Sequence, residues 1–105
     1  MMPRRILPIA VALLLGTFVS AHAATIQISI ENMAFASAKT PAKVGDSIDW
    51  INKDIVAHTA TARNGDFDVT IPPKKTVTVV LKKAGTIDYY CRFHPNMKAT
   101  LVVTP

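Results

Sequence analysis

The chain has 105 residues, a formal net charge of +5 and a single cysteine. A chain of this length forms one domain, and with one cysteine it has no internal disulfide to stabilise it. Its lysines and arginines are not interleaved with aromatic residues, so the positive charge does not indicate a nucleic-acid-binding protein.

The first 23 residues have the pattern of a secretory signal peptide. Arg4 and Arg5 precede an apolar stretch between positions 9 and 19, and the segment ends in the small-x-small sequence Ala-His-Ala. This apolar stretch is shorter than the roughly 20 residues that a membrane-spanning helix needs. We expect cleavage after Ala23, which removes two of the twelve basic residues and none of the seven acidic ones and leaves a net charge of +3. The predicted product, residues 24–105, is a periplasmic domain without a membrane anchor.

Residues 24–105 show the alternation of β-strands and no helical period of useful length. Ile26, Ile28 and Ile30 share one face of a first strand, for example, with polar residues between them. Turn residues such as Asn64-Gly65 separate the runs. The predicted strands, in chain order, are residues 26–30, a short strand or turn at 33–35, residues 48–50, a strand containing His58, and residues 74–83, 87–91 and 98–104. Six to eight short strands at this spacing predict an all-β, two-sheet β-sandwich.

The most informative motif is the loop between the last two predicted strands. Cys91, His94 and Met97 place a thiolate, an imidazole and a thioether at every third position. A second imidazole, that of His58, lies 33 residues upstream in a predicted strand. Two imidazoles, one thiolate and one thioether form a donor set that suits copper, because Cu(I) prefers soft sulfur and Cu(II) accepts nitrogen.

We therefore predict one type 1 copper ion per chain. His58, Cys91 and His94 would form a trigonal plane around it, and Met97 would be a weak axial donor. A single short loop cannot supply the whole plane without strain, so His58 has to come from a neighbouring strand. An exported protein with one cysteine also needs a reason to keep a thiol in an oxidising compartment, and a metal bound to Cys91 provides it.

Residues near the predicted ligands suggest how the site is supported. Thr59 and Thr61 could form hydrogen bonds that tether their strand to the Cys91 loop, although threonine is also common in strands for its β-propensity alone. Phe93 could either form an apolar rim around His94, through which electrons would enter, or pack in the core. If the cations of Arg92 and Lys98 flank this rim, an acidic partner would associate more slowly as the salt concentration rises.

The run from Val44 to Asn52, then His58, then the run from Ala84 to Cys91 with its ligand loop, resembles the plastocyanin and amicyanin group of blue-copper proteins, the cupredoxins. The resemblance covers nearly all of residues 24–105, and the short Cys-x-x-His-x-x-Met loop is most similar to amicyanin. It implies a Greek-key sandwich, a type 1 copper held by the four residues named above, and electron transport between periplasmic redox partners. Family members often have proline before the first histidine and asparagine after it. Ala57 and Thr59 occupy those positions in this chain. The hydrogen-bonding tether that the asparagine implies is therefore not carried over.

Several functions remain open on the sequence. The first is a monomeric, non-enzymatic electron shuttle whose donor and acceptor proteins are unknown. The second is a periplasmic copper carrier or storage protein, which would use the same soft ligands. A hydrolase with Cys91 as nucleophile and His94 as base lacks a residue to orient that base. Zinc would suit one cysteine and two histidines, but Met97 is a poor zinc ligand.

Overall fold

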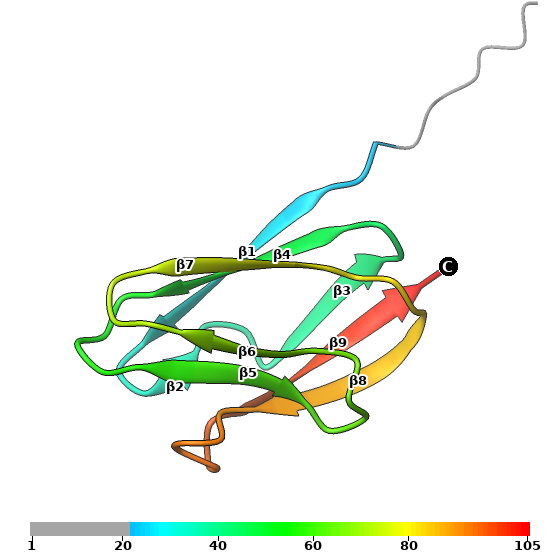
Figure 1. The fold of residues 1–105 in the computed structure, drawn as a ribbon. Coiled ribbons are helices and arrows are strands. Elements are labelled where there is room, and N and C mark those ends of the chain that lie inside the picture. The colour runs from blue at the N-terminus through cyan, green and yellow to red at the C-terminus, as the bar shows by residue number, and fades with distance from the viewer. Residues whose placement is uncertain (1–21) are drawn as a thin grey trace, which may run out of the picture.

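The computed structural model describes residues 22–105, which form nine strands and no helix (Figure 1). The strands are β1 (Thr25–Glu31), β2 (Ala34–Phe35), β3 (Lys39–Lys43), β4 (Ser47–Asn52), β5 (His58–Ala62), β6 (Asp68–Ile71), β7 (Thr76–Val80), β8 (Gly85–Tyr90) and β9 (Lys98–Thr104). Within the described residues no helix is long and apolar enough to cross a membrane. The predicted signal peptide lies almost wholly outside the described residues, so the structure leaves that prediction untested.

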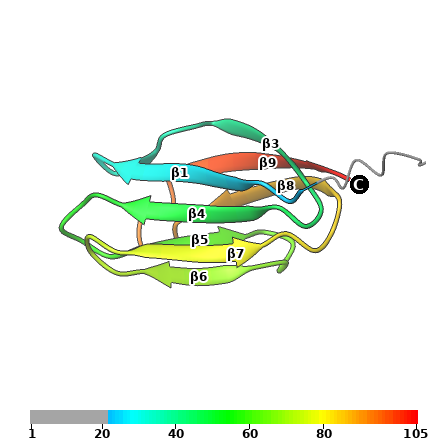
Figure 2. The ribbon, with the colours of Figure 1, turned by 90° about the horizontal axis from the view of Figure 1, so that it is seen from above.

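The strands form two mixed sheets that pack face to face, as Figure 2 shows from above. One sheet has the order β2-β1-β4-β7, and the other has the order β3-β9-β8-β5-β6. Strands β1 and β4 pair in parallel, as do β3 and β9, and the remaining pairs are antiparallel. The predicted all-β, two-sheet sandwich is confirmed.

The alternating residues of the two inner faces form the core. Trp50 of β4 and Tyr89 of β8 are fully buried and meet edge to face, with their ring centroids 5.7 Å apart. Phe67 contacts both rings and closes the core beside β6. Burial raises the pKa of Tyr89 to about 12, so this phenol stays neutral. Burial of such large aromatic side chains is the main source of stability in a domain that has no disulfide.

All seven predicted segments, including the short strand or turn at 33–35, contain strands in the structure, and three features differ. Strand β7 ends at Val80, although the sequence predicts a strand over residues 74–83. Cys91 lies just beyond β8, yet it is buried on the same side as Ile87 and Tyr89, as the alternation predicts. Strands β3 and β6 were not predicted, because both are short sheet edges and β3 contains Pro41, which edge strands tolerate.

The topology brings two distant parts of the chain to one end of the sandwich. Strand β4 ends and β5 begins there, and β8 delivers the chain into the loop that leads to β9, drawn in orange in Figure 1. Strands β5 and β8 are neighbours in the same sheet, with Thr61 paired to Tyr90. The start of β5 therefore lies close to the loop that follows β8.

Candidate metal centre

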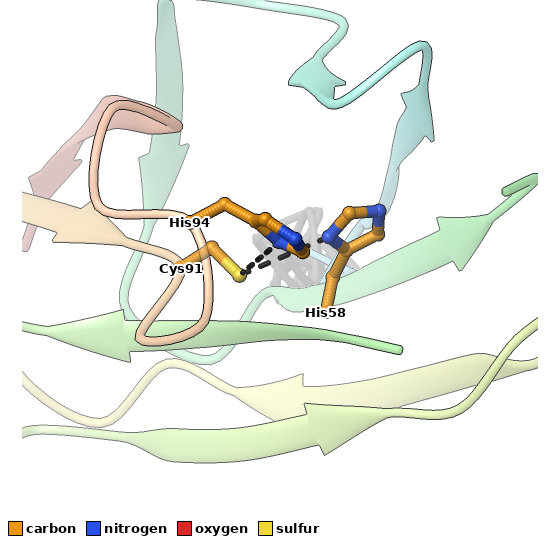
Figure 3. A group of neighbouring side chains, drawn as sticks. All are labelled: His58, Cys91 and His94. Atoms are coloured by element: carbon orange, nitrogen blue, oxygen red, sulfur yellow. Dashed lines mark hydrogen bonds between the residues drawn. The ribbon is translucent and has the colours of Figure 1, made fainter. Parts of the chain in front are cut away.

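The three predicted plane-forming residues come from the adjoining ends of β5 and β8 (Figure 3). His58 is the first residue of β5, and Cys91 and His94 belong to the loop after β8. Backbone hydrogen bonds hold this loop in tight turns: the amide of His94 donates to the carbonyl of Cys91, and the amide of Met97 donates to that of His94. The amide of Cys91 donates in turn to the carbonyl of Met97. The loop is therefore closed on itself by its own backbone.

The donor atoms of His58, Cys91 and His94 all lie within 4.8 Å of one another. The sulfur of Cys91 is 3.8 Å from Nδ1 of His58 and 3.7 Å from Nδ1 of His94. The two imidazole rings meet edge to face, with their centroids 5.1 Å apart. Figure 3 shows both rings on the same side of the Cys91 sulfur. Both Cys91 and His58 are fully buried, whereas His94 is partly exposed.

These separations allow one ion to contact all three donors. Metal bonds of about 2.3 Å to sulfur and about 2.0 to 2.1 Å to nitrogen, at angles between about 109° and 120°, separate sulfur from nitrogen by about 3.5 to 3.8 Å. The observed sulfur–nitrogen distances of 3.7 and 3.8 Å fall in this range. The donor set of one thiolate and two imidazoles, with the thioether of Met97 beside His94, is typical of blue-copper centres.

The orientation of His58 is fixed by Asp54, which lies in the loop before β5. Nε2 of His58 lies 2.8 Å from Oδ2 of Asp54. The pKa of Asp54 is held below its usual range, first by the backbone amide of Met33 and also by His58 and the amide of Asn32. An ionised carboxylate only accepts hydrogen bonds, so Nε2 carries the proton and Nδ1 keeps a free lone pair toward Cys91.

Asp54 also joins this histidine to the turn between β1 and β2. Its carboxylate accepts hydrogen bonds from the amides of Asn32 and Met33, at 2.9 and 3.0 Å. Both turn residues have positive φ, 53° and 60°, which is unfavourable for a methionine. Oδ1 of Asp54 therefore stabilises the strained turn through Asn32. Oδ2 contacts both the amide of Met33 in that turn and the imidazole of His58.

Asn52 holds the loop that carries Asp54. Its buried side-chain amide donates to the carbonyls of Val56, Ile71 and Pro72, and its oxygen accepts the amide of Asp54. One side chain thus satisfies several backbone groups that would otherwise be buried without partners.

Thr59 links β5 to the loop that carries Cys91 and His94, a link that the sequence suggested as one of two roles for this threonine. Its backbone amide donates to the sulfur of Cys91 at 3.3 Å, and its hydroxyl oxygen accepts the backbone amide of Arg92 at 2.8 Å. The predicted tether from Thr59 is confirmed, so a threonine spans the two strands where relatives often have asparagine. Thr61 acts one step further away, through a hydrogen bond to Thr59.

Met97 is 5% exposed and lines a hollow of about 330 Å³ beside His94. Met33, Pro95 and Asn96 form the rest of this hollow. Phe93 is 51% exposed, so it is not a core residue and belongs to the apolar rim around His94. The partly exposed edge of His94 is therefore surrounded mainly by apolar side chains.

Of the two cations expected near this rim, Arg92 lies beside it and Lys98 does not line it. The guanidinium of Arg92 is 5.6 Å from the ring centroid of Phe93 and donates to the carboxylate of Asp68 at 3.1 Å. Lys98 lines a different hollow, together with Arg63 and Asp88. The salt-dependent steering of an acidic partner stays a prediction.

The same side chains also resemble a nucleophile with an oriented base. The sulfur of Cys91, the imidazole of His58 and the carboxylate of Asp54 are connected in that order, which supplies the orienting residue that the sequence lacked for such a site. However, Cys91 and His58 are both 0% exposed, so no substrate can reach the sulfur. The arrangement is suited to holding an ion and not to nucleophilic attack.

Sequence reasoning missed Asn52 and Asp54 as parts of the site. Neither residue belongs to a spacing pattern, and their roles depend on how the loop between β4 and β5 folds back. The position of Asp54 four residues before His58 is the only local signal, and it is weak in a segment that is not helical.

Comparison with known proteins agrees with this geometry. A model of the cupredoxin-like domain family matches residues 5–103. Amicyanin-alpha of Methylorubrum extorquens is 30% identical over 89 residues, which cover 79% of this chain and 75% of that protein. The methylamine utilization protein MauL of the same organism is 30% identical over 99 residues, covering 90% and 87% of the two chains. The reduced Cu(I) form of an amicyanin mutant superposes with a TM-score of 0.66 at 27% identity, covering 75% of this chain and 81% of that one.

Proposed function

Because the chain belongs to the cupredoxin-like family, we propose that it is a type 1 copper protein that carries single electrons between redox partner proteins. The observation that carries the proposal is the convergence of one sulfur and two imidazole nitrogens from β5 and the loop after β8. The proposed ligands are Nδ1 of His58, Sγ of Cys91, Nδ1 of His94 and Sδ of Met97. Bound copper would supply a one-electron couple between Cu(II) and Cu(I).

The protein's own contribution is to hold the donors still. Asp54 orients His58, the amide of Thr59 donates to the sulfur of Cys91, and the turn hydrogen bonds fix the loop that carries His94. Side chains that are already positioned need little rearrangement when the charge of the site changes. Low rearrangement favours electron transfer, and four protein ligands leave no open position for a substrate, so we propose that the protein is a carrier and not an enzyme.

Electrons would enter and leave at His94. Of the three plane-forming residues, it is the one with an exposed edge, and the rim of Phe93, Pro95 and Met33 offers an apolar surface for transient contact. We propose that the protein acts as a monomer and that its partners dock here.

An absorption spectrum of the copper-loaded protein tests the proposal. We expect an intense visible charge-transfer band from the thiolate to Cu(II), which Cys91→Ser abolishes because the chain has no other thiolate. Val44→Ser is a matched control, since it changes an exposed residue outside the ligand set. A colourless copper-loaded protein would contradict the proposal.

A copper carrier is the second candidate, and the hollow beside His94 favours it. Two thioethers, those of Met33 and Met97, line the same open hollow as the imidazole of His94. Soft donors at an opening suit the transfer of Cu(I) from one protein to another. Slow electron self-exchange, combined with fast transfer of copper to an acceptor apoprotein, would favour the carrier over the shuttle.

Export to the periplasm is part of the proposal. The backbone amide of Ala24 donates to Asp46 at 2.8 Å, and Ala24 becomes the N-terminal residue if cleavage follows Ala23. The new ammonium group would then face the carboxylate of Asp46, and a charge-assisted hydrogen bond is stronger than a neutral one. Mass spectrometry of the exported protein should find Ala24 as its first residue, and an intact N-terminus would contradict this.

A further inference from the structure

A line of hydrogen bonds leaves the ligand loop and ends at a carboxylate on β6. The amide of Arg92 donates to Oγ1 of Thr59 at 2.8 Å, and the hydroxyls of Thr59 and Thr61 are 3.0 Å apart. The hydroxyl of Thr61 donates to Oδ1 of Asp68 at 2.8 Å. The same oxygen accepts Nε of Arg92, so the line returns to the residue from which it started.

The direction of every proton in this line is determined. The pKa of Asp68 is held below its usual range by the hydroxyl of Thr61 and by the guanidinium of Arg92, so its carboxylate is an acceptor only. Thr61 must therefore give its proton to Asp68, and Thr59 must give its own proton to Thr61. The oxygen of Thr59 is then left to accept the amide of Arg92. Hydrogen bonds that all point one way strengthen one another, most of all where water is excluded.

The line passes beside the sulfur of the proposed metal centre at Thr59. Thr59 is fully buried and Thr61 nearly so, and both lie on one face of β5. Thr59 uses its hydroxyl for Arg92 and its backbone amide for the sulfur of Cys91. A shift of Thr59 would therefore change the hydrogen bond to the sulfur and the position of the residue after Cys91 at the same time.

We propose that Asp68 is a remote positioning residue for the sulfur of Cys91, acting through the hydroxyls of Thr61 and Thr59. Asp68 contacts none of the proposed ligands, and nothing in its sequence surroundings marks it as part of the site. The proposed effect of Asp68 on the position of the sulfur depends on the fold alone. Its proposed effect on bound copper rests on the proposed function.

The same sheet contains a matched control. The hydroxyl of Thr100 on β9 donates to Oδ1 of Asp88 on β8 at 2.8 Å, which is the same cross-strand contact as that from Thr61 to Asp68. Thr100 and Asp88 do not lead to the ligand loop. Removing either hydrogen bond should have a similar direct effect on the sheet. Only the loss of the bond from Thr61 to Asp68 should also affect Cys91.

The test compares Thr61→Val and Asp68→Ala with the control Thr100→Val and with the conservative variant Thr61→Ser. In the metal-free protein, amide hydrogen exchange at Arg92 should become about tenfold faster in the first two variants, because each breaks the line. The amide proton shift of Thr59, which reports its bond to the sulfur, should change in the same two variants. Thr61→Ser and Thr100→Val should match the unsubstituted protein at both amides.

In the copper-loaded protein, the charge-transfer band and the reduction potential should shift in Thr61→Val and Asp68→Ala only. Unchanged exchange at Arg92 in Thr61→Val, or equal acceleration in Thr100→Val, would overturn the proposal. If the unsubstituted protein bound no copper, the proposed function would fail, while the two amide measurements would still decide whether Asp68 positions the sulfur.

Discussion

Oδ2 of Asp54 lies 2.8 Å from Nε2 of His58, on the side of the imidazole that faces away from the sulfur of Cys91. The proposed metal centre therefore has a carboxylate directly behind one of its nitrogen donors. A negative charge there makes the imidazole a stronger donor and favours the more highly charged ion.

Replacing this carboxylate by a neutral amide tests its role. In Asp54→Asn we expect copper affinity to fall by about 10- to 100-fold, the usual effect of losing a hydrogen-bond partner of a ligating histidine. The reduction potential should rise, because Cu(II) loses more electrostatic stabilisation than Cu(I) does. Competition titration with a chelator measures the first effect, and voltammetry measures the second.

Asp46→Asn is the matched control for that experiment. Asp46 also accepts two backbone amides, those of Ala24 and Lys43, but it contacts no proposed ligand. Equal effects of the two substitutions on affinity and potential would mean that Asp54 supports only the fold.

Asn52 should be important for stability because it satisfies several buried backbone groups. We expect Asn52→Ala to lower the free energy of unfolding by about 2 to 3 kcal/mol, since its hydrogen-bond partners lose their contact without gaining water. Asn64→Ala, in the exposed turn between β5 and β6, should cost less than about 1 kcal/mol. Urea unfolding of the metal-free proteins makes the comparison, and equal losses would contradict the role assigned to Asn52.

The ligand role of Met97 can be separated from its packing role. Met97→Leu keeps the volume of a buried side chain, so it should change the free energy of unfolding of the metal-free protein by less than about 1.5 kcal/mol. The loaded protein should still bind copper through its plane, but with a changed spectrum and potential, because the axial donor tunes both. A spectrum and potential identical to those of the unsubstituted protein would make Met97 a core residue only.

The sandwich and the meeting of His58 with Cys91 and His94 could be predicted from the sequence, for two physical reasons. Alternation with period two assigns strands and their buried faces directly. The donor set is so specific that its members have to converge. Residues whose function depends on tertiary contacts alone carry no such pattern, which is why Asp54 and Asn52 were missed.

Asp68 is an intermediate case. The hairpin loop between Ala62 and Phe67 places Thr61 opposite Asp68. The amide of Gly65 donates to the carbonyl of Ala62 to close a turn, and the φ of 84° at Gly65 is one that glycine adopts readily. The sequence indicated a turn here but not a strand after it, so the pairing of the two residues could not be inferred.

Acid should destabilise the fold partly through Asp46. The pKa of Asp46 lies below its ordinary value because the amide of Ala24, and then that of Lys43, donate to it. A carboxyl group whose pKa is lower in the folded state stabilises the fold above its unfolded pKa of about 3.9, and this stabilisation is lost as the pH falls through the folded pKa. The free energy of unfolding should thus fall below about pH 4, and less steeply in Asp46→Asn. Urea unfolding at several pH values measures this, and identical slopes for the two proteins would refute it.

The central claim is that one sulfur and two imidazole nitrogens hold copper in a plane that changes little when an electron arrives. X-ray absorption at the copper edge, on the oxidised and the reduced protein, tests it most directly. We expect one sulfur and two nitrogen neighbours in both states, at nearly unchanged distances, and loss of the sulfur neighbour in Cys91→Ser. A copper ion without a sulfur neighbour, or one that loses a histidine nitrogen on reduction, would contradict the claim.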